Sequence, residues 1–288
     1  MGGLGNQLFC YAAARRLALV NDAELVIDDV TGFLRDQHYR RRYCLDNFHI
    51  PSRKATPAER LEPFERYRRG LMKWWSRKKS FAERRYVEQE GHDFDHRVLT
   101  LKVNGTVYLD GVWPSEGYFK DTERTIRDDL RIIPPNDPVN QSVAEDIRNN
   151  NSVALHVRWF DGPGTGHSQH VSDDYYHRAI AMIDRKVQSP RYFLFSDEPD
   201  AARAKLGLPE DRVTLVSHNS GDENAYADLW LMTQCRHFIT ANSTFSWWGA
   251  WLGQGTDKIV ITPKHEIRDG KLLAWGASVQ IPSGWLEI

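Results

Sequence analysis

The chain has 288 residues, of which 41% are apolar, and its formal net charge is -1. That length suffices for one large domain or for two domains of ordinary size, each with its own core. A nearly neutral chain is a poor polyanion binder, so nucleic acid is not expected as a partner. The three cysteines are scattered without a Cys-x-x-Cys pair, which favours a reducing compartment. With neither a signal peptide nor a run long enough to span a membrane, we expect a cytoplasmic protein.

The first half of the chain predicts a mixed region of helices and strands. Apolar residues recur at helical spacing over 7–20, the runs 24–28 and 106–110 predict strands, and 119–130 predicts another helix. The first helix follows a glycine-rich turn, Gly2-Gly-Leu-Gly-Asn-Gln7. In an α/β fold such a turn normally follows a strand, so we expect the first strand of this sheet to be missing.

Residues 64–85 form a basic stretch that contains Trp74 and Trp75. A charge run of this kind is typical of a solvated helix face. The alternative is contact with an anionic membrane surface or a charged acceptor. We therefore expect at most a peripheral membrane contact.

The prolines of 132–138 interrupt any helix or strand, and we expect two domains, 1–148 and 149–288. In the second domain strands alternate with helices, which predicts a parallel sheet with ligands beyond the carboxyl ends of its strands. The expected strands are 153–157, 192–195, 213–216, 237–240 and 258–262, and the expected helices are 174–187, 201–205, 223–235 and 243–252.

Polar residues follow three of these strands. His156 and Arg158 end the first strand, Ser196 and Asp197 follow the second, and Asn242-Ser-Thr244 follow the fourth. An arginine matches diphosphate oxygens without a metal, and a carboxylate accepts from ribose hydroxyls or from the N–H edge of guanine. This arrangement predicts a cradle for a nucleotide diphosphate.

The run Asn242-Ser-Thr-Phe-Ser-Trp-Trp-Gly-Ala-Trp251 predicts a strand-to-helix junction. A helix N-terminus presents unpaired N–H groups and attracts phosphate, and the hydroxyls of Ser243, Thr244 and Ser246 add donors there. The alternative is a capped core helix whose tryptophans only pack.

Two other motifs predict less. The glycine turn at 2–7 lacks the third glycine of a dinucleotide fingerprint, so delivery of Asn6 and Gln7 to an interdomain cleft is the better interpretation. The loop 161–174 carries His167, His170 and several aspartates without fixed spacing. A mobile substrate-covering loop fits it better than a metal site, and no metal is expected.

Four segments together resemble glycosyltransferase family 11, the α-1,2-fucosyltransferases. They begin at Gly2 (Gly-Gly-Leu-Gly-Asn-Gln-Leu-Phe), at Tyr108 (a segment that ends in Trp-Pro-Ser-Glu-Gly-Tyr-Phe119), at Phe195 (Phe-Ser-Asp-Glu) and at Asn242, the last being the most specific. His156, Arg158 and Asp161 fall on the family's His-x-Arg-Arg-x-Asp motif, with Trp159 in place of the usual second arginine.

The resemblance implies a GT-B architecture, in which two Rossmann-like domains face each other across a cleft, with the acceptor mainly on the first and GDP-fucose mainly on the second. It implies metal-independent, inverting transfer of L-fucose to the 2-hydroxyl of a terminal galactose, with no cofactor besides the donor substrate. The partners are then GDP-fucose and a galactose-terminated glycan.

Each candidate residue has an expected role under this hypothesis. Arg158 stabilises the leaving diphosphate, Asp161 is the candidate base, and Asn6 orients the reacting groups. The acceptor is expected to contact Gln7, Trp113 and Trp159. The donor is expected to contact His156, Arg158, Ser196, Asp197, Asn242, Ser243, Thr244, Phe245 and Ser246. Two alternatives remain open: a transferase that uses another GDP-sugar, and a carbohydrate-binding protein without catalysis.

Overall fold

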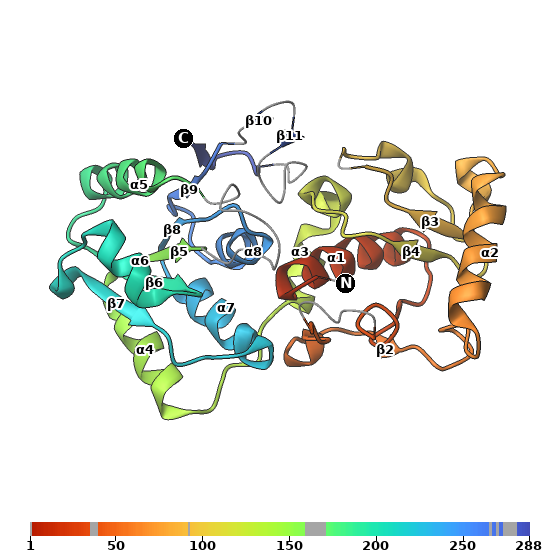
Figure 1. The fold of residues 1–288 in the computed structure, drawn as a ribbon, viewed down its shortest axis with the longest axis horizontal. Helices are drawn as coiled ribbons and strands as arrows, with labels where there is room; N and C mark the ends of the chain where they lie inside the picture. The colour runs from red at the N-terminus through yellow and green to blue at the C-terminus, as the bar shows by residue number, and fades with distance from the viewer. Residues whose placement is uncertain are drawn as a thin grey trace. The chain divides into compact units, whose positions relative to one another are not determined.

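The computed structural model describes residues 2–34, 40–91, 93–158, 171–264, 267–268, 271–272 and 281–288. The chain divides into two compact units, one formed mainly by Met1–Arg131 and the other by Ile132–Ala277 with Ile281–Ile288 (Figure 1). The boundary falls before the expected 148/149 position. The reason is that helix α4 (Pro138–Asn149) packs against strand β5 (Asn151–Val157) and helix α7 (Ala225–Gln234) of the second unit.

The first unit is built around helix α1 (Leu4–Val20), whose Leu8, Phe9 and Ala12 are fully buried. Strand β1 (Val26–Ile27) pairs in parallel with β2 (Arg53–Lys54), and β3 (Tyr86–Glu88) pairs in parallel with β4 (Tyr108–Asp110). The remaining helices are α2 (Glu65–Arg77), α3 (Glu123–Asp129) and the 3-10 turns Leu45–Asn47, Phe81–Glu83, His96–Thr100, Glu116–Tyr118 and Lys120–Thr122. The strands predicted at 24–28 and 106–110 are therefore present but shorter than expected.

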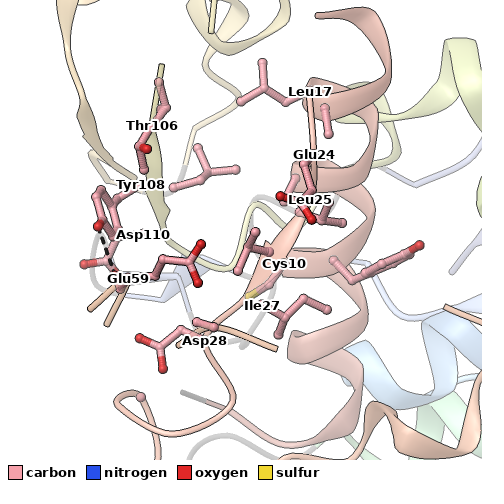
Figure 2. A pocket seen from close by; sticks show the side chains of 18 of the residues that line it. Cys10, Leu17, Glu24, Leu25, Ile27, Asp28, Glu59, Thr106, Tyr108 and Asp110 are labelled. Atoms are coloured by element: carbon pink, nitrogen blue, oxygen red, sulfur yellow. Dashed lines mark hydrogen bonds between the residues drawn. The ribbon is translucent and has the colours of Figure 1, made fainter. Parts of the chain in front are cut away.

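A pocket of about 460 Å³ lies between α1, β1 and β4 (Figure 2). Leu25 and Ile27 line one side, and Tyr108 and Asp110 line the other.

The second unit contains a six-stranded sheet with the order β12-β9-β8-β5-β6-β7, and all its pairs are parallel. The other strands of this sheet are β6 (Pro190–Ser196), β7 (Val213–Val216), β8 (His237–Ile239), β9 (Val260–Thr262) and β12 (Leu286–Glu287). A separate antiparallel hairpin joins β10 (Ile267–Arg268) and β11 (Lys271–Leu272). Numbered along the chain, the sheet has the strand order 3-2-1-4-5-6 of a Rossmann fold. The predicted α/β class is confirmed.

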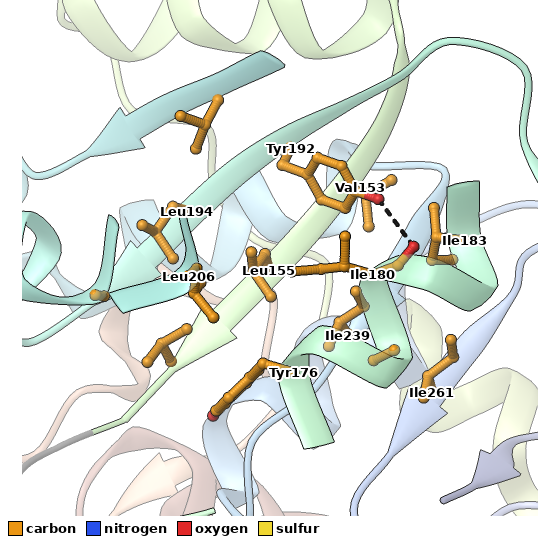
Figure 3. Packing of buried hydrophobic residues seen from close by; sticks show 14 of the residues in the cluster. Val153, Leu155, Tyr176, Ile180, Ile183, Tyr192, Leu194, Leu206, Ile239 and Ile261 are labelled. Atoms are coloured by element: carbon orange, nitrogen blue, oxygen red, sulfur yellow. Dashed lines mark hydrogen bonds between the residues drawn. The ribbon is translucent and has the colours of Figure 1, made fainter. Parts of the chain in front are cut away.

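Helices cover both faces of this sheet and bury two cores. On one face, α5 (Asp173–Lys186) and α6 (Pro199–Leu206) pack on Val153, Leu155 and Val157 (Figure 3). On the other face, α4, α7 and α8 (Thr244–Leu252) pack around Ala154 and its neighbours. The 3-10 turns Glu210–Arg212 and Asp222–Asn224 complete the unit. Because side chains alternate along a strand, His156 and Arg158 follow Ala154 toward the α8 face.

No helix in the described part of the chain is both long and apolar enough to cross a bilayer.

Candidate functional site

The carboxyl ends of β5, β6 and β8 bring three of the predicted segments to one level. Val157 pairs with Ser196 of β6, and Leu155 pairs with Ile239 of β8. Continuing this register places Arg158 level with Asp197 on one side and with Asn242 on the other. In a sheet of Rossmann order, the strand order reverses between β5 and β8, and ligands bind at such a switch point. The candidate site therefore lies where β5 ends and α8 begins.

Arg158 and Ser243 meet at this switch point. The Nη1 of Arg158 donates to the Oγ of Ser243 at 3.3 Å. Ser243 is the N-cap of α8, and the same oxygen accepts the backbone N–H of Phe245 at 3.3 Å. The pairing brings a permanent cation to the positive end of a helix dipole, and these are the two features that bind a diphosphate.

Ser246 holds the loop before α8 in place. Its Oγ accepts the backbone N–H of Ala241 at 3.2 Å and donates to the Ser243 carbonyl at 3.3 Å. The side chain is buried. Ser246 thus holds the backbone at the N-terminus of α8 from the buried side. Asn242, Thr244 and Phe245 belong to this same stretch of backbone, so their positions depend on these two hydrogen bonds.

His156 lies beneath Arg158 on the same face of β5. Its ring centroid is 5.7 Å from that of Phe245. Burial, helped by the charge of Arg158, lowers the pKa of His156 to about 3. Its Nδ1 has no hydrogen-bond partner within the described residues. A neutral imidazole at this point supplies a hydrogen bond, not a second positive charge.

Two tyrosines of α5 support the site, and the sequence did not single them out. Tyr175 donates from its hydroxyl to the Thr240 carbonyl at 2.7 Å, which fixes the end of β8. Burial raises the pKa of Tyr176. The Arg158 backbone opposes this rise, and the negative charge of Asp197 adds to it. The available signal was a pair of aromatic hydroxyls in the first turn of a helix that follows strand 153–157.

Ser196 and Asp197 stand at the end of β6 as expected. The Ser196 hydroxyl accepts the backbone N–H of Glu198 at 3.1 Å, and Asp197 is exposed. An exposed carboxylate level with Arg158 can accept hydrogen bonds from a ribose or a base.

Asp228 is a second carboxylate at this edge, and the sequence analysis missed it. It lies near the start of α7, which follows the carboxyl end of β7, and its Oδ1 accepts from Asn219 Nδ2 at 2.9 Å. Burial raises the pKa of Asp228 to about 7. An acid inside the otherwise apolar run 227–232 was the signal that could have found it.

The tryptophans of α8 pack in the core. Trp247, Trp248 and Trp251 are buried, and the rings of Trp247 and Trp251 stack at 6.1 Å. A Cβ on Gly249 would lie 2.9 Å from the Met232 sulfur, so a glycine lets α7 approach α8 closely. At the other end of α8, Lys258 Nζ donates to the carbonyls of Ala250 and Gly253 at 2.7 and 2.8 Å. These contacts anchor the helix whose N-terminus forms the site.

The remaining described candidates belong to the first unit. Asn6 is buried in the first turn of α1. The Gln7 amide donates to the Arg42 carbonyl at 2.7 Å and accepts the Cys44 N–H at 2.9 Å, so it fixes a loop of its own unit. Trp113 is 1% exposed and packs edge-on against Tyr118. An acceptor contact through Trp113 would need this ring to be uncovered.

Trp159 and Asp161 lie outside the described residues, as do His167 and His170. Among the residues that the structure describes, no group of three or more His, Cys, Asp or Glu side chains could hold a metal ion.

Comparison with known proteins identifies the family. The model of "Glycosyl transferase family 11" matches residues 65–277. The chain is 32% identical over 289 residues to the O-antigen biosynthesis glycosyltransferase WbnK of Escherichia coli, covering 91% of this chain and 92% of that protein. It is 26% identical over 295 residues to an alpha-1,2-colitosyltransferase of Escherichia coli, covering 100% of this chain and 96% of that protein.

Solved structures resemble the chain more distantly. Fucosyltransferase NodZ from Bradyrhizobium is 14% identical, with a TM-score of 0.49, and the match covers 86% of this chain and 89% of that one. The sequence motifs and the family match together carry the assignment. The chain belongs to glycosyltransferase family 11.

Proposed function

We propose that the protein transfers L-fucose from GDP-fucose to the 2-hydroxyl of a terminal galactose, with inversion and without a metal. The single observation that carries the proposal is the 3.3 Å contact between Arg158 and the N-cap of α8 at the switch point of the sheet. The α-1,2 linkage in the name of the colitosyltransferase relative supports the same regiochemistry.

The donor binds at the carboxyl edge of the second unit. Its diphosphate lies against Arg158 and the N–H groups at the start of α8, close to the neutral His156. Asp197 and Ser196 hold the ribose or the guanine. Asp228 adds a partly buried carboxylate that accepts from the N–H edge of the guanine. In this arrangement a cation balances the negative charge of the GDP diphosphate, and a carboxylate recognises the guanine.

The reaction is one in-line displacement at the fucose anomeric carbon. The bond from that carbon to the β-phosphate oxygen breaks as the bond to the galactose O2 forms, and the hydroxyl proton passes to Asp161, the candidate base. Negative charge grows on the departing GDP, where Arg158 and the α8 N–H groups stabilise it. Loss of one such donor typically raises a barrier by about 3 kcal/mol.

A second donor deserves a direct test because one relative is named as a colitosyltransferase. Two sugars that differ by a single small group are separated by the shape of a pocket, and one methylene changes binding by only about 1–3 kcal/mol. The contacts of Arg158, Asp197 and Asp228 would serve any GDP-sugar.

The deciding experiment is a transfer screen with mass detection. GDP-fucose, GDP-mannose and GDP-linked colitose are each offered with galactose-terminated oligosaccharides, in the presence and absence of EDTA. We expect a mass gain of one fucosyl residue and no loss of rate with the chelator, since Arg158 supplies the charge. Transfer from another GDP-sugar but not from GDP-fucose would mean that the proposed donor is wrong. Loss of activity in EDTA would refute metal independence. GDP binding by calorimetry without any transfer would leave a non-catalytic binding protein.

A further inference from the structure

Helix α2 presents an apolar stripe on its outer face. Phe64, Tyr67, Leu71, Trp74 and Trp75 are all exposed, from 42% for Leu71 to 76% for Phe64. Tyr67, Leu71, Trp74 and Trp75 are spaced by four, three and one residues, which places them on one arc of the helix about 100° wide, and Phe64 is the N-cap that precedes them. Large apolar side chains that gather in this way mark an interaction surface, whereas single exposed ones need no explanation.

The opposite side of α2 faces the first unit, and acidic residues of that unit neutralise the positive charges on this side. Ser76 is buried and accepts the Tyr86 backbone N–H at 3.1 Å. Lys73 pairs with Glu88 and Asp110 at 3.0 and 2.9 Å, and Arg69 pairs with Asp28. The cations on this side therefore have acidic partners within the unit.

The cations beside the stripe differ from those on the inner side in having no acidic partner among the described residues. Arg68, Lys78 and Lys79 lie at its margins and are exposed, and none of them forms an ion pair with an acidic side chain in the described part of the chain. Lys78 Nζ sits 3.5 Å above the Trp74 ring, so the ammonium stands at the level of the indoles. Positive charge beside Trp, Tyr and Phe is the pattern of a helix that lies in a bilayer interface.

We propose that α2 docks the protein on an anionic lipid bilayer. The stripe enters the headgroup and upper acyl region, while Arg68, Lys78 and Lys79 contact lipid phosphates. The sign of these charges selects the occupant, because the cations at the margins of the stripe have no acidic partner among the described residues, and a neutral partner would not match their charge. This surface belongs to the first unit and the proposed donor site to the second, so the inference goes beyond the proposed function.

The test is flotation of the full chain with vesicles, without donor or acceptor. We expect binding to phosphatidylcholine vesicles that contain about one-third phosphatidylglycerol, and little binding to phosphatidylcholine alone. Each cation near such a surface strengthens binding about fivefold, so the Arg68→Gln/Lys78→Gln/Lys79→Gln variant should bind roughly a hundredfold more weakly. The matched control is Arg185→Gln/Lys186→Gln/Lys264→Gln, which removes three exposed cations of the second unit and should bind as the wild type does.

The tryptophans give an independent readout. Insertion should shift their emission to the blue, and Trp74→Phe/Trp75→Phe should bind within about threefold of wild type but lose most of that shift, since Phe keeps the apolar ring. Trp74→Ser/Trp75→Ser should bind at least about tenfold more weakly, with folding checked by circular dichroism.

Three results would overturn the proposal. The first is failure of the wild type to float with anionic vesicles. The second is equal binding to neutral and anionic vesicles. The third is an equal effect of the α2 and control substitutions. A dimer in sedimentation that Trp74→Ser/Trp75→Ser dissociates, without any vesicle binding, would assign the stripe to a second copy instead.

Discussion

At the scale of single residues, Arg158 matters through the shape of its guanidinium as much as through its charge. The planar group carries five donors, so it can hold the Ser243 hydroxyl and still present parallel N–H groups to a diphosphate. A lysine keeps the charge but has no fork. The proposed site therefore depends on an arginine at position 158.

We expect Arg158→Lys to lower kcat/KM for GDP-fucose about a hundredfold, because the growing charge loses an aligned donor. GDP affinity should fall as well, since the free diphosphate uses the same fork. Steady-state kinetics and calorimetry measure both effects. Arg185→Lys, at an exposed position of α5, is the control and should leave both values unchanged. Near wild-type transfer by Arg158→Lys would remove the fork from the mechanism.

Asp228 should make stability depend on pH. Burial raises its pKa from 3.8 to about 7, so between these values the folded protein holds a proton that the unfolded chain has released. The unfolded state binds fewer protons there, and the contribution of Asp228 to the free energy of unfolding falls as pH rises toward 7. Urea unfolding at pH 5 and pH 8 should show this loss in the wild type and not in Asp228→Asn. An equal pH dependence in both proteins would contradict it.

GDP binding should respond to the same group in the opposite sense. If Asp228 accepts from guanine, the ionised form binds, and a pKa near 7 makes GDP about tenfold weaker at pH 6 than at pH 8. Asp228→Asn should flatten that profile in calorimetry. A wild-type profile without slope would take Asp228 out of the base pocket.

At the scale of elements, the second unit could be predicted because its helices alternate regularly with buried strands, of which the central β5 and β6 are seven residues long. The predicted strand 213–216 matches β7, and the predicted helix 243–252 differs from α8 by one residue. The contact of Arg158 with Ser243 follows from this topology, since both residues come after the carboxyl ends of adjacent parallel strands. Local patterns and the rule about strand ends were sufficient there.

Less of the first unit could be predicted, because its strands near 24–28 and 106–110 are shorter than expected. Its paired strands are two or three residues long, so no alternating pattern has room to develop. The Gln7 amide is engaged by the backbone of Arg42 and Cys44, far along the chain, and the ring of Trp113 is covered by its own unit. Such tertiary contacts leave no signal in the local sequence. A polar side chain near a motif therefore looks the same in the sequence whether it binds a ligand or holds a loop.

At the scale of the whole molecule, the proposed chemistry divides between the two units. The proposed donor contacts belong to the second unit, at the carboxyl edge of its sheet and the start of α8, and the family match extends from 65 in the first unit to 277. Asn6, at the start of α1, is the first unit's proposed contribution to orienting the reacting groups. A residue that only orients should change turnover and leave GDP binding alone.

Asn6→Asp tests that division because it preserves the shape of a buried side chain and changes only its hydrogen-bonding groups. We expect kcat to fall about a hundredfold, as misplacement of reacting groups does, while the Kd for GDP stays within about twofold of wild type. Asn104→Asp, at an exposed position of the same unit, should change neither value. A parallel fall of GDP affinity and turnover would place Asn6 in the donor pocket, and unchanged turnover would leave it without a role in transfer. Only an isolated loss of kcat agrees with a donor held by the second unit and reacting groups oriented from the first.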